Sequence, residues 1–131
     1  MSLNNNIQNA LATQLAAVPG IPSIAFPNTN YEPAAGTSFV RPSLMPSRSV
    51  LYTFTQGKHE GMYQVDIFTS VKKGTAPLLL IADAIRDKFR SQNKLTSGTD
   101  LIFIQEVSVS QARRVESWWS CYVEINYFCF N

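Results

Sequence analysis

Six of the seven prolines of this 131-residue chain lie between positions 19 and 46, and this clustering restricts the fold more than any other feature of the sequence. Proline fixes φ and lacks the backbone N–H, so a regular helix cannot run through the region. The stretch also carries isoleucine, phenylalanine and other apolar side chains, which are too numerous for a solvated linker. We therefore expect extended chain. Because Pro42 removes a ladder donor, any strand over Phe39–Leu44 should lie at a sheet edge or carry a bulge.

Apolar residues recur at three- and four-residue steps in two segments, which predicts two amphipathic helices. The first runs from about Leu3 to Ala17 and ends at Val18-Pro19-Gly20, because the residue before proline avoids helical dihedrals. The second begins at Thr75-Ala76-Pro77, where threonine can cap and proline is tolerated in the first turn. Its apolar stripe consists of Leu78, Ile81, Ala82, Ile85 and Phe89.

Two segments rich in β-branched and aromatic residues, Val50–Thr55 and Met62–Thr69, predict a β-hairpin. The polar segment Gln56–Gly61 between them contains two glycines and is predicted to form the tip. In the second strand, Tyr63 and Val65 share one face and Gln64 lies on the other, so one side is expected in the core and one partly in water.

The C-terminal third is predicted to hold a polar loop over Asn93–Asp100, a strand over Leu101–Val107 and a long strand over Trp118–Phe130. One face of the last strand is mainly apolar, and the other mixes polar and aromatic side chains. These elements predict an α+β fold in one domain spanning residues 1–131: a mostly antiparallel sheet of about four to six strands with two helices packed on one face, plus the hairpin.

Composition excludes several classes of protein. With 45% hydrophobic and 15% charged residues the chain can bury a core, so it is not a disordered segment. The apolar runs are far shorter than the roughly 20 residues that a membrane-spanning helix needs, and the first residues do not resemble a signal peptide. The net charge of +2 gives little reason to expect a nucleic-acid clamp. Arg113-Arg114 near Trp118-Trp119 is the nearest approach to a nucleic-acid surface, and a solvated or structural role for these residues is favoured.

Catalytic patterns are weak. His59 beside Glu60 is the first acid–base candidate, but the predicted hairpin tip offers no apolar walls. Cys121 and Cys129 lie eight residues apart in one strand, roughly 26 Å, so they cannot bridge each other there and are interpreted as buried thiols. Thr96–Asp100 lacks the spacing of a phosphate loop. We predict no catalytic, metal or cofactor-binding residues and no cofactor.

Aromatic residues form 11% of the chain, and many lie at both parities of the last strand. This is more than one small core hides comfortably, and aromatic residues and arginine are enriched at interface centres. An exposed interaction surface is therefore expected, although a core that takes up all the aromatics remains an alternative.

The sequence from Leu3 to Phe68 resembles the phage tail terminator-like family of long-tailed phages and prophages. Its opening helix and irregular proline-rich connection are similar to those of the family, and the phrase from Phe39 to Pro46 is the most specific part. The quoted segments are Val18-Pro19-Gly20, Ile24–Asn28, Tyr31–Pro33, Gly36–Pro46, Gly61–Phe68 and Ala82–Ile85 with Phe89.

The resemblance implies a virion structural protein and no enzyme. Such proteins assemble as a ring, usually a hexamer, on the last layer of the tail tube, stop tube polymerisation and offer a surface for head–tail joining. The implied partners are copies of the chain, the tail tube protein and the head connector or a neck protein. A membrane and sequence-specific nucleic acid are not implied, although the genome passes through such a ring. The implied location is the virion tail, assembled in the host cytoplasm.

A ring subunit needs two different complementary patches. We expect the subunit interface to use the proline-bearing strand and the mixed face of the last strand, and the tube contact to use the hairpin tip. The expected interface residues are Arg41, Pro42, Leu44, Trp118, Tyr122 and Phe128, and the expected tube contacts are Arg48, Lys58 and His59. Two alternatives remain: another head–tail joining protein that binds the connector, and a small enzyme with an unrecognised site near His59.

Overall fold

The computed structural model describes residues 3–25, 38–51, 57–70, 72, 74–91, 93–97, 100–116 and 118–130. Strands make up 55% of the described part and helices 30%. The elements in chain order are α1 Leu3–Ala16, β1 Ser23–Ile24, β2 Phe39–Leu51, β3 Gly57–Ser70, α2 Ala76–Ser91, β4 Lys94–Ser97, β5 Asp100–Val109, β6 Arg113–Val115 and β7 Trp118–Phe130.

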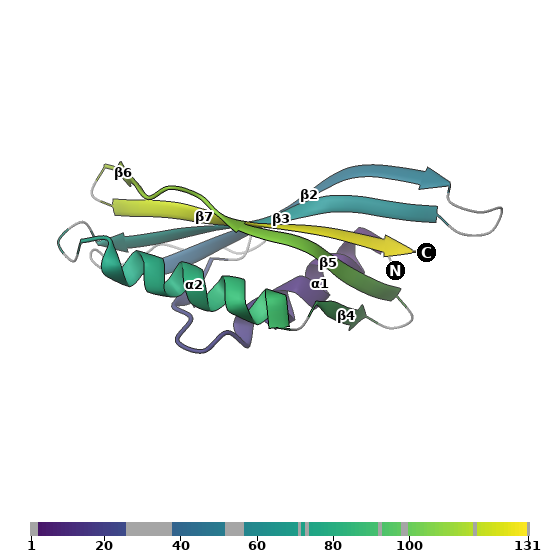
Figure 1. The fold of residues 1–131 in the computed structure, drawn as a ribbon, viewed down its shortest axis with the longest axis horizontal. Helices are drawn as coiled ribbons and strands as arrows, with labels where there is room; N and C mark the ends of the chain where they lie inside the picture. The colour runs from purple at the N-terminus through teal and green to yellow at the C-terminus, as the bar shows by residue number, and fades with distance from the viewer. Residues whose placement is uncertain are drawn as a thin grey trace.

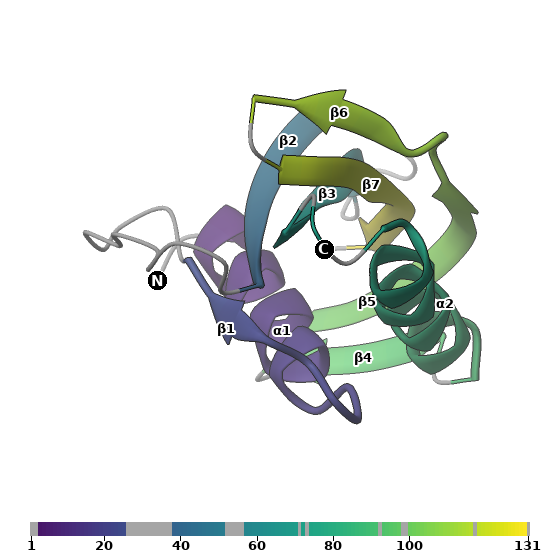
Figure 2. The same ribbon diagram turned by 90° about the vertical axis from the view of Figure 1, so that its left-hand side faces the viewer.

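The strands form one seven-stranded sheet in the order β1-β2-β3-β7-β5-β4, with β6 pairing with β7. β1 and β2 are parallel, and the other pairs are antiparallel, so the sheet is mixed. It curls into a half-barrel, with β2, β7 and β5 following the curve and β4 at its far end (Figure 2). Both helices lie on the same side of the sheet (Figure 1).

The predicted α+β class is therefore wrong, because the protein is mostly β. The sequence patterns missed three strands, β1, β4 and β6, each of two to four residues. Strands this short contain too few residues to display an alternating pattern. The patterns also stopped short of the full β2, which continues through two prolines as far as Leu51.

The prolines of β2 occupy positions where no ladder bond is lost. Ala25 N–H donates to the carbonyl oxygen of Val40 at 2.7 Å, so the backbone groups of Val40 point away from β3. Backbone direction alternates along a strand, and Pro42 and Pro46 have the same direction as Val40. The register shifts between Pro46 and Arg48. The prediction of an edge position or a bulge over Phe39–Leu44 is confirmed in part: in the described part of the chain β1 pairs only with Phe39 and Val40, so Pro42 lies at an edge, and the bulge lies beyond Leu44.

The two helices are confirmed close to their predicted bounds, and their apolar stripes form a core with the concave face of the sheet. Ile7, Leu11 and Leu15 of α1 are fully buried, as are Leu78, Ala82, Ile85 and Phe89 of α2. They pack against buried residues of β3, β5 and β7. Within the described ranges, neither helix is long and apolar enough to cross a membrane.

The predicted hairpin tip is wrong in its position. Gly57–Gly61 belong to β3 and pair with β2, residues 58–61 also pair with β7, and residues 52–56 lie outside the described part of the chain. Gly61 is required by a close approach: a Cβ there would lie 2.7 Å from Cζ of Tyr127 and 2.9 Å from the carbonyl oxygen of Met45. A glycine inside a strand often marks such an approach.

The polar loop predicted over Asn93–Asp100 is also corrected in part, because it contains β4. This strand pairs with the first half of β5, and Leu95 faces Ile102 across the pair. The strand predicted over Leu101–Val107 is confirmed as β5 with slightly wider bounds, and the strand over Trp118–Phe130 is confirmed as β7.

Candidate interaction surface

The sheet face that points away from the helices, the outer face, differs in burial from the inner face. In β3, Tyr63, Val65 and Ile67 are at most 1% exposed, whereas the residues between them are only half-buried. The same alternation runs along β7. Among the described residues no helix covers the outer face (Figure 1). Apart from the buried Phe39, Ser70 and Ser120, the described side chains of β3 and β7 on this face and Arg41 of β2 are at least partly exposed.

Three phenylalanines gather on the outer face where β5 meets the end of β7. The rings of Phe103 and Phe128 stack with their centroids 5.0 Å apart, and Phe130 meets them edge-on at 6.4 and 5.7 Å. Lys94 Nζ lies 5.8 Å from the Phe103 centroid, and Lys58 Nζ lies 5.1 Å from the Phe128 centroid. This set, the Phe103 cluster, combines half-buried rings with positive charge.

A second aromatic group, the Phe39 cluster, lies at the opposite end of the outer face. Phe39 stacks on Phe68 with centroids 4.7 Å apart and meets Trp118 edge-on at 5.3 Å. The guanidinium carbon of Arg41 lies 5.7 Å from both phenylalanine centroids. Phe39 is buried under its neighbours, while Phe68 and Trp118 are half-buried and Arg41 is exposed.

A polar band separates the two clusters. Gln64 Nε2 donates to Asp66 Oδ1 at 2.9 Å, and Glu124 and Asn126 lie beside Gln64 and Met62 in the register of β3 and β7. Charged and amide groups that remain partly exposed keep this part of the outer face hydrated. The outer face therefore presents two separate aromatic areas rather than one continuous apolar patch.

Four of the six predicted interface residues lie on the outer face, but not together. Arg41 and Trp118 belong to the Phe39 cluster, and Phe128 belongs to the Phe103 cluster. Tyr122 lies between them and pairs with Asp66 of β3. The residues could thus serve two different contacts.

The other two predicted interface residues, Pro42 and Leu44, lie on the inner face. Pro42 is buried, and Leu44 is half-buried and packs against the core. Their side chains contribute to the monomer. What they offer outward is the backbone of an edge strand, because β1 pairs with β2 only at Phe39 and Val40.

The predicted tube contacts are not grouped at a tip. Lys58 lies on the outer face and forms an ion pair with Glu60 at 3.2 Å. His59, the next residue in β3, pairs with Cys129 and points to the opposite face. Only the backbone of Arg48 is described, and it pairs with Glu60.

Burial holds three titratable side chains of the inner face, Cys121, Tyr63 and Tyr127, in their neutral forms. Burial, with smaller contributions from Asp66 and Asp83, raises the pKa of the Cys121 thiol to about 11. Burial likewise raises the pKa of Tyr127 to about 12 and the pKa of Tyr63 further still. A thiol with so high a pKa is not a thiolate at neutral pH. In the described part of the chain, no group of three or more His, Cys, Asp or Glu residues could hold a metal ion.

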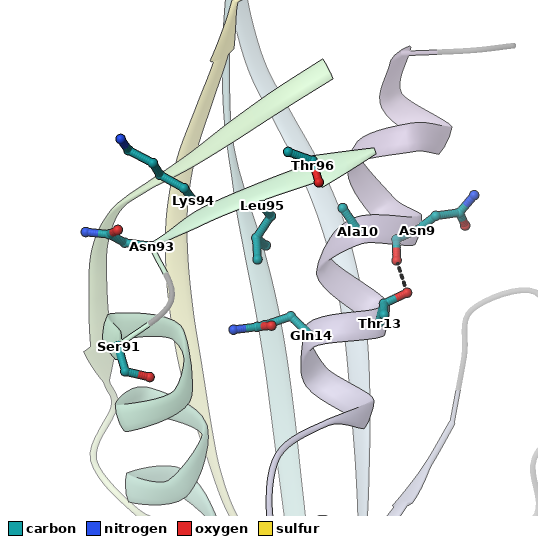
Figure 3. Close-up of a pocket in the computed structure, with 9 residues that line it drawn as sticks. All are labelled: Asn9, Ala10, Thr13, Gln14, Ser91, Asn93, Lys94, Leu95 and Thr96. Carbon is teal, nitrogen blue, oxygen red and sulfur yellow. Dashed lines mark hydrogen bonds between the residues drawn. The ribbon is translucent and has the colours of Figure 1, made fainter. Parts of the chain in front are cut away.

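A groove of about 490 Å³ opens between α1, the end of α2 and β4 (Figure 3). Its lining is mostly amides and hydroxyls, with Lys94 as its ionisable side chain. The lining residues are Asn9, Ala10, Thr13, Gln14, Ser91, Asn93, Lys94, Leu95 and Thr96. Among the described residues that line this β4 groove there is no carboxylate or imidazole.

A family model described as phage tail terminator protein matches residues 6–127. The chain belongs to the phage tail terminator family. The match covers the two helices and nearly the whole sheet, so the resemblance of the proline-rich first half extends to the complete fold. Membership makes the chain a structural component of a phage tail or neck, associated with other virion components.

Solved structures share the fold over nearly the whole length of this chain. One, whose title states no function, has a TM-score of 0.73 and 21% identity and covers 98% of this chain and 96% of its own. Another, titled "Virion of native gene transfer agent (GTA) particle", has a TM-score of 0.72 and 17% identity, with coverages of 99% and 98%. At these identities the likeness concerns the fold alone. No curated protein matches the chain.

Sequence reasoning missed the β4 groove and the grouping of the outer aromatics. The mixed face of β7 is visible in the sequence, but the partners of Phe128 and Trp118 come from β5 and β2. Which residues meet depends on strand order and register, and local patterns do not carry that information. The groove is built from α1, the end of α2 and β4, and the sequence of β4 predicted a loop.

Proposed function

We propose that the protein assembles as a ring of identical subunits, six in the arrangement usual for the family, on the last layer of the phage tail tube. The ring ends tube polymerisation and presents a surface for the head connector. The protein carries out no reaction, and it assembles from the host cytoplasm into the virion. The family match over residues 6–127 is the observation that carries this proposal.

The outer face supports the proposal because it supplies two different areas for contact. A head-to-tail ring requires each subunit to offer two distinct complementary patches. The Phe103 cluster carries two lysines, whereas the Phe39 cluster carries Trp118 and Arg41. Half-buried aromatic rings next to cations are typical of interface centres.

Deletion of the gene followed by electron microscopy of the particles tests termination. Loss of a terminator leaves the tube free to grow, so overlong tails are expected. Normal-length tails detached from heads would contradict termination and favour a neck protein that binds the connector. Complementation with the wild-type gene should restore the normal length.

The contribution of the outer face is tested by a charge placed in an aromatic cluster. We expect Phe103→Glu to prevent ring formation, because the carboxylate must be desolvated in the contact. The matched control is Ser108→Glu, an exposed position on the same strand and the same face outside the clusters. Light scattering with and without tube protein measures the assembly, and thermal melting verifies that both variants fold. Equal assembly of the two variants would exclude the Phe103 cluster from the contact.

A further inference from the structure

β4 is an edge strand with backbone groups directed away from the sheet. Ile104 N–H donates to the carbonyl oxygen of Asn93 at 2.8 Å, which fixes the alternation of the β4–β5 ladder. In an antiparallel pair every second residue exchanges no bonds with its partner. Lys94 and Thr96 occupy these positions, so their N–H and C=O groups point outward. In the described part of the chain no other strand lies on this side of β4.

Other edges of the sheet are less able to accept a strand. On β2 the outward positions beyond Val40 are Pro42, Leu44 and Pro46, so only Leu44 offers an N–H over this stretch. On β5, the guanidinium of Arg90 from α2 donates to the carbonyl oxygen of Val107 at 3.5 Å. β4 therefore offers an outward backbone N–H donor and C=O acceptor at both Lys94 and Thr96.

The β4 groove gives this edge a lining that suits a peptide. β4 runs from the end of α2 toward α1 across the groove, and Gln14 points into the groove from α1, whereas the Asn9 side chain points away from β4 (Figure 3). Amides and hydroxyls of this kind can bond a peptide backbone and polar side chains. The Lys94 ammonium lies beside this edge on the outer face, 5.8 Å from the Phe103 centroid, where it would meet side chains of an added strand, and this favours a neutral or acidic segment.

We propose that the β4 edge and its groove bind an extended, neutral or acidic segment of another virion protein, which adds a strand to the sheet. Strand addition takes its affinity from main-chain hydrogen bonds and its specificity from alternate side chains. This inference rests on the proposed role in the virion, but it does not depend on the number of subunits in the ring.

A second copy of the chain fits this edge less well. The long edge strand β2 lacks the donors that a ladder with β4 would need. Pairing of β4 with β4 of another copy would be two-fold and would end at two subunits, whereas a ring requires head-to-tail contacts. A different protein of the particle is therefore the occupant that the geometry favours.

Hydrogen–deuterium exchange of the wild-type protein, free and within purified virions, tests the occupant. Exchange of the outward amides of Lys94 and Thr96 should slow by about tenfold or more in the virion and should stay fast in the free protein at every concentration. Protection that grows with concentration in the free protein would identify a second copy as the occupant and overturn the proposal. The absence of added protection in virions would overturn strand addition altogether.

Thr96→Pro supplies the matched mutational test, because it removes an outward N–H without removing a bond to β5. We expect its incorporation into particles to fall about tenfold, as for the loss of one hydrogen bond. Thr96→Ala keeps the N–H and should incorporate normally. Normal incorporation of Thr96→Pro would refute the proposal. If Thr96→Pro does not fold, the exchange experiment decides. Normal-length tails after gene deletion would contradict the proposed termination function. That outcome is separate from the tests of strand addition at β4.

Discussion

The inner and outer faces of the sheet are built from alternate residues of the same strands, but the two faces differ in burial. On the inner face, Tyr63, Val123 and Ile125 are almost fully buried beneath two helices. On the outer face, Phe103 and Phe128 stack on each other but remain half-buried. The difference indicates that burial stabilises the protein mainly on one face, while the second face keeps the partly exposed aromatic surface to which we assign assembly in the proposed function.

The strongest test of this comparison is the truncation of a ring on the inner side. Phe89 of α2 is fully buried, so Phe89→Ala should lower the free energy of unfolding by about 3–5 kcal/mol, the sum of lost transfer energy and a cavity. Urea denaturation followed by circular dichroism measures the loss. A loss close to that of an outer-face truncation would contradict the assignment of stability to the inner face.

Gly61→Ala tests the close packing of the inner face against a strand backbone. The added Cβ collides with the buried ring of Tyr127 and with the carbonyl of Met45, and overpacking of this kind costs about 1–3 kcal/mol. The hydroxyl of Tyr127 is the nearest obstacle, so Tyr127→Phe in the same chain should recover part of the loss. Denaturant midpoints of the two single variants and the double variant give the coupling. Strictly additive effects would show that the ring does not occupy the space above Gly61.

The same glycine shows where sequence reasoning reaches its limit. Gly57 and Gly61 flank polar residues and locally indicate a turn, but the space above Gly61 is taken by Tyr127 from a distant strand. By contrast, the two helices, the edge position of Pro42 and the long strand β7 follow from periodicity and from the missing proline donor, which are local properties.

The candidate surface was predictable only in outline. The mixed face of β7 places Tyr122 and Phe128 on one side, and the register confirms that they share the outer face. Their division between two ends of the sheet, and the burial of Pro42, depend on strand order and on where the helices pack. Those are tertiary features that override local preference.

Phe128→Ala tests the outer face and should act on assembly more than on stability. The Phe128 ring is half-buried, and its removal leaves Phe103 without its stacked partner. A loss of about 0.5–1.5 kcal/mol in unfolding free energy is therefore expected. Ring formation, followed by light scattering, should decline much more than this change in stability implies. A variant that unfolds easily but assembles normally would reverse the roles assigned to the two faces.

The smallest predicted effect concerns pH and again depends on the inner face. Burial raises the pKa of Cys121 from an ordinary value of 9.0 to about 11, so well below pH 9 the thiol is neutral in both the folded and the unfolded chain. As the pH rises from 9 toward 11, the unfolded chain ionises first, and the free energy of unfolding falls. Tyr127, whose pKa is raised to about 12, extends the loss to higher pH. Between pH 8 and 9.5 we expect a decline of less than about 1 kcal/mol. Cys121→Ala should make that decline smaller, because it removes one of the two buried thiols of the inner face. An unchanged pH dependence in this variant would show that the Cys121 thiol is hydrated in the native protein and that the inner face is less closed than its burial indicates.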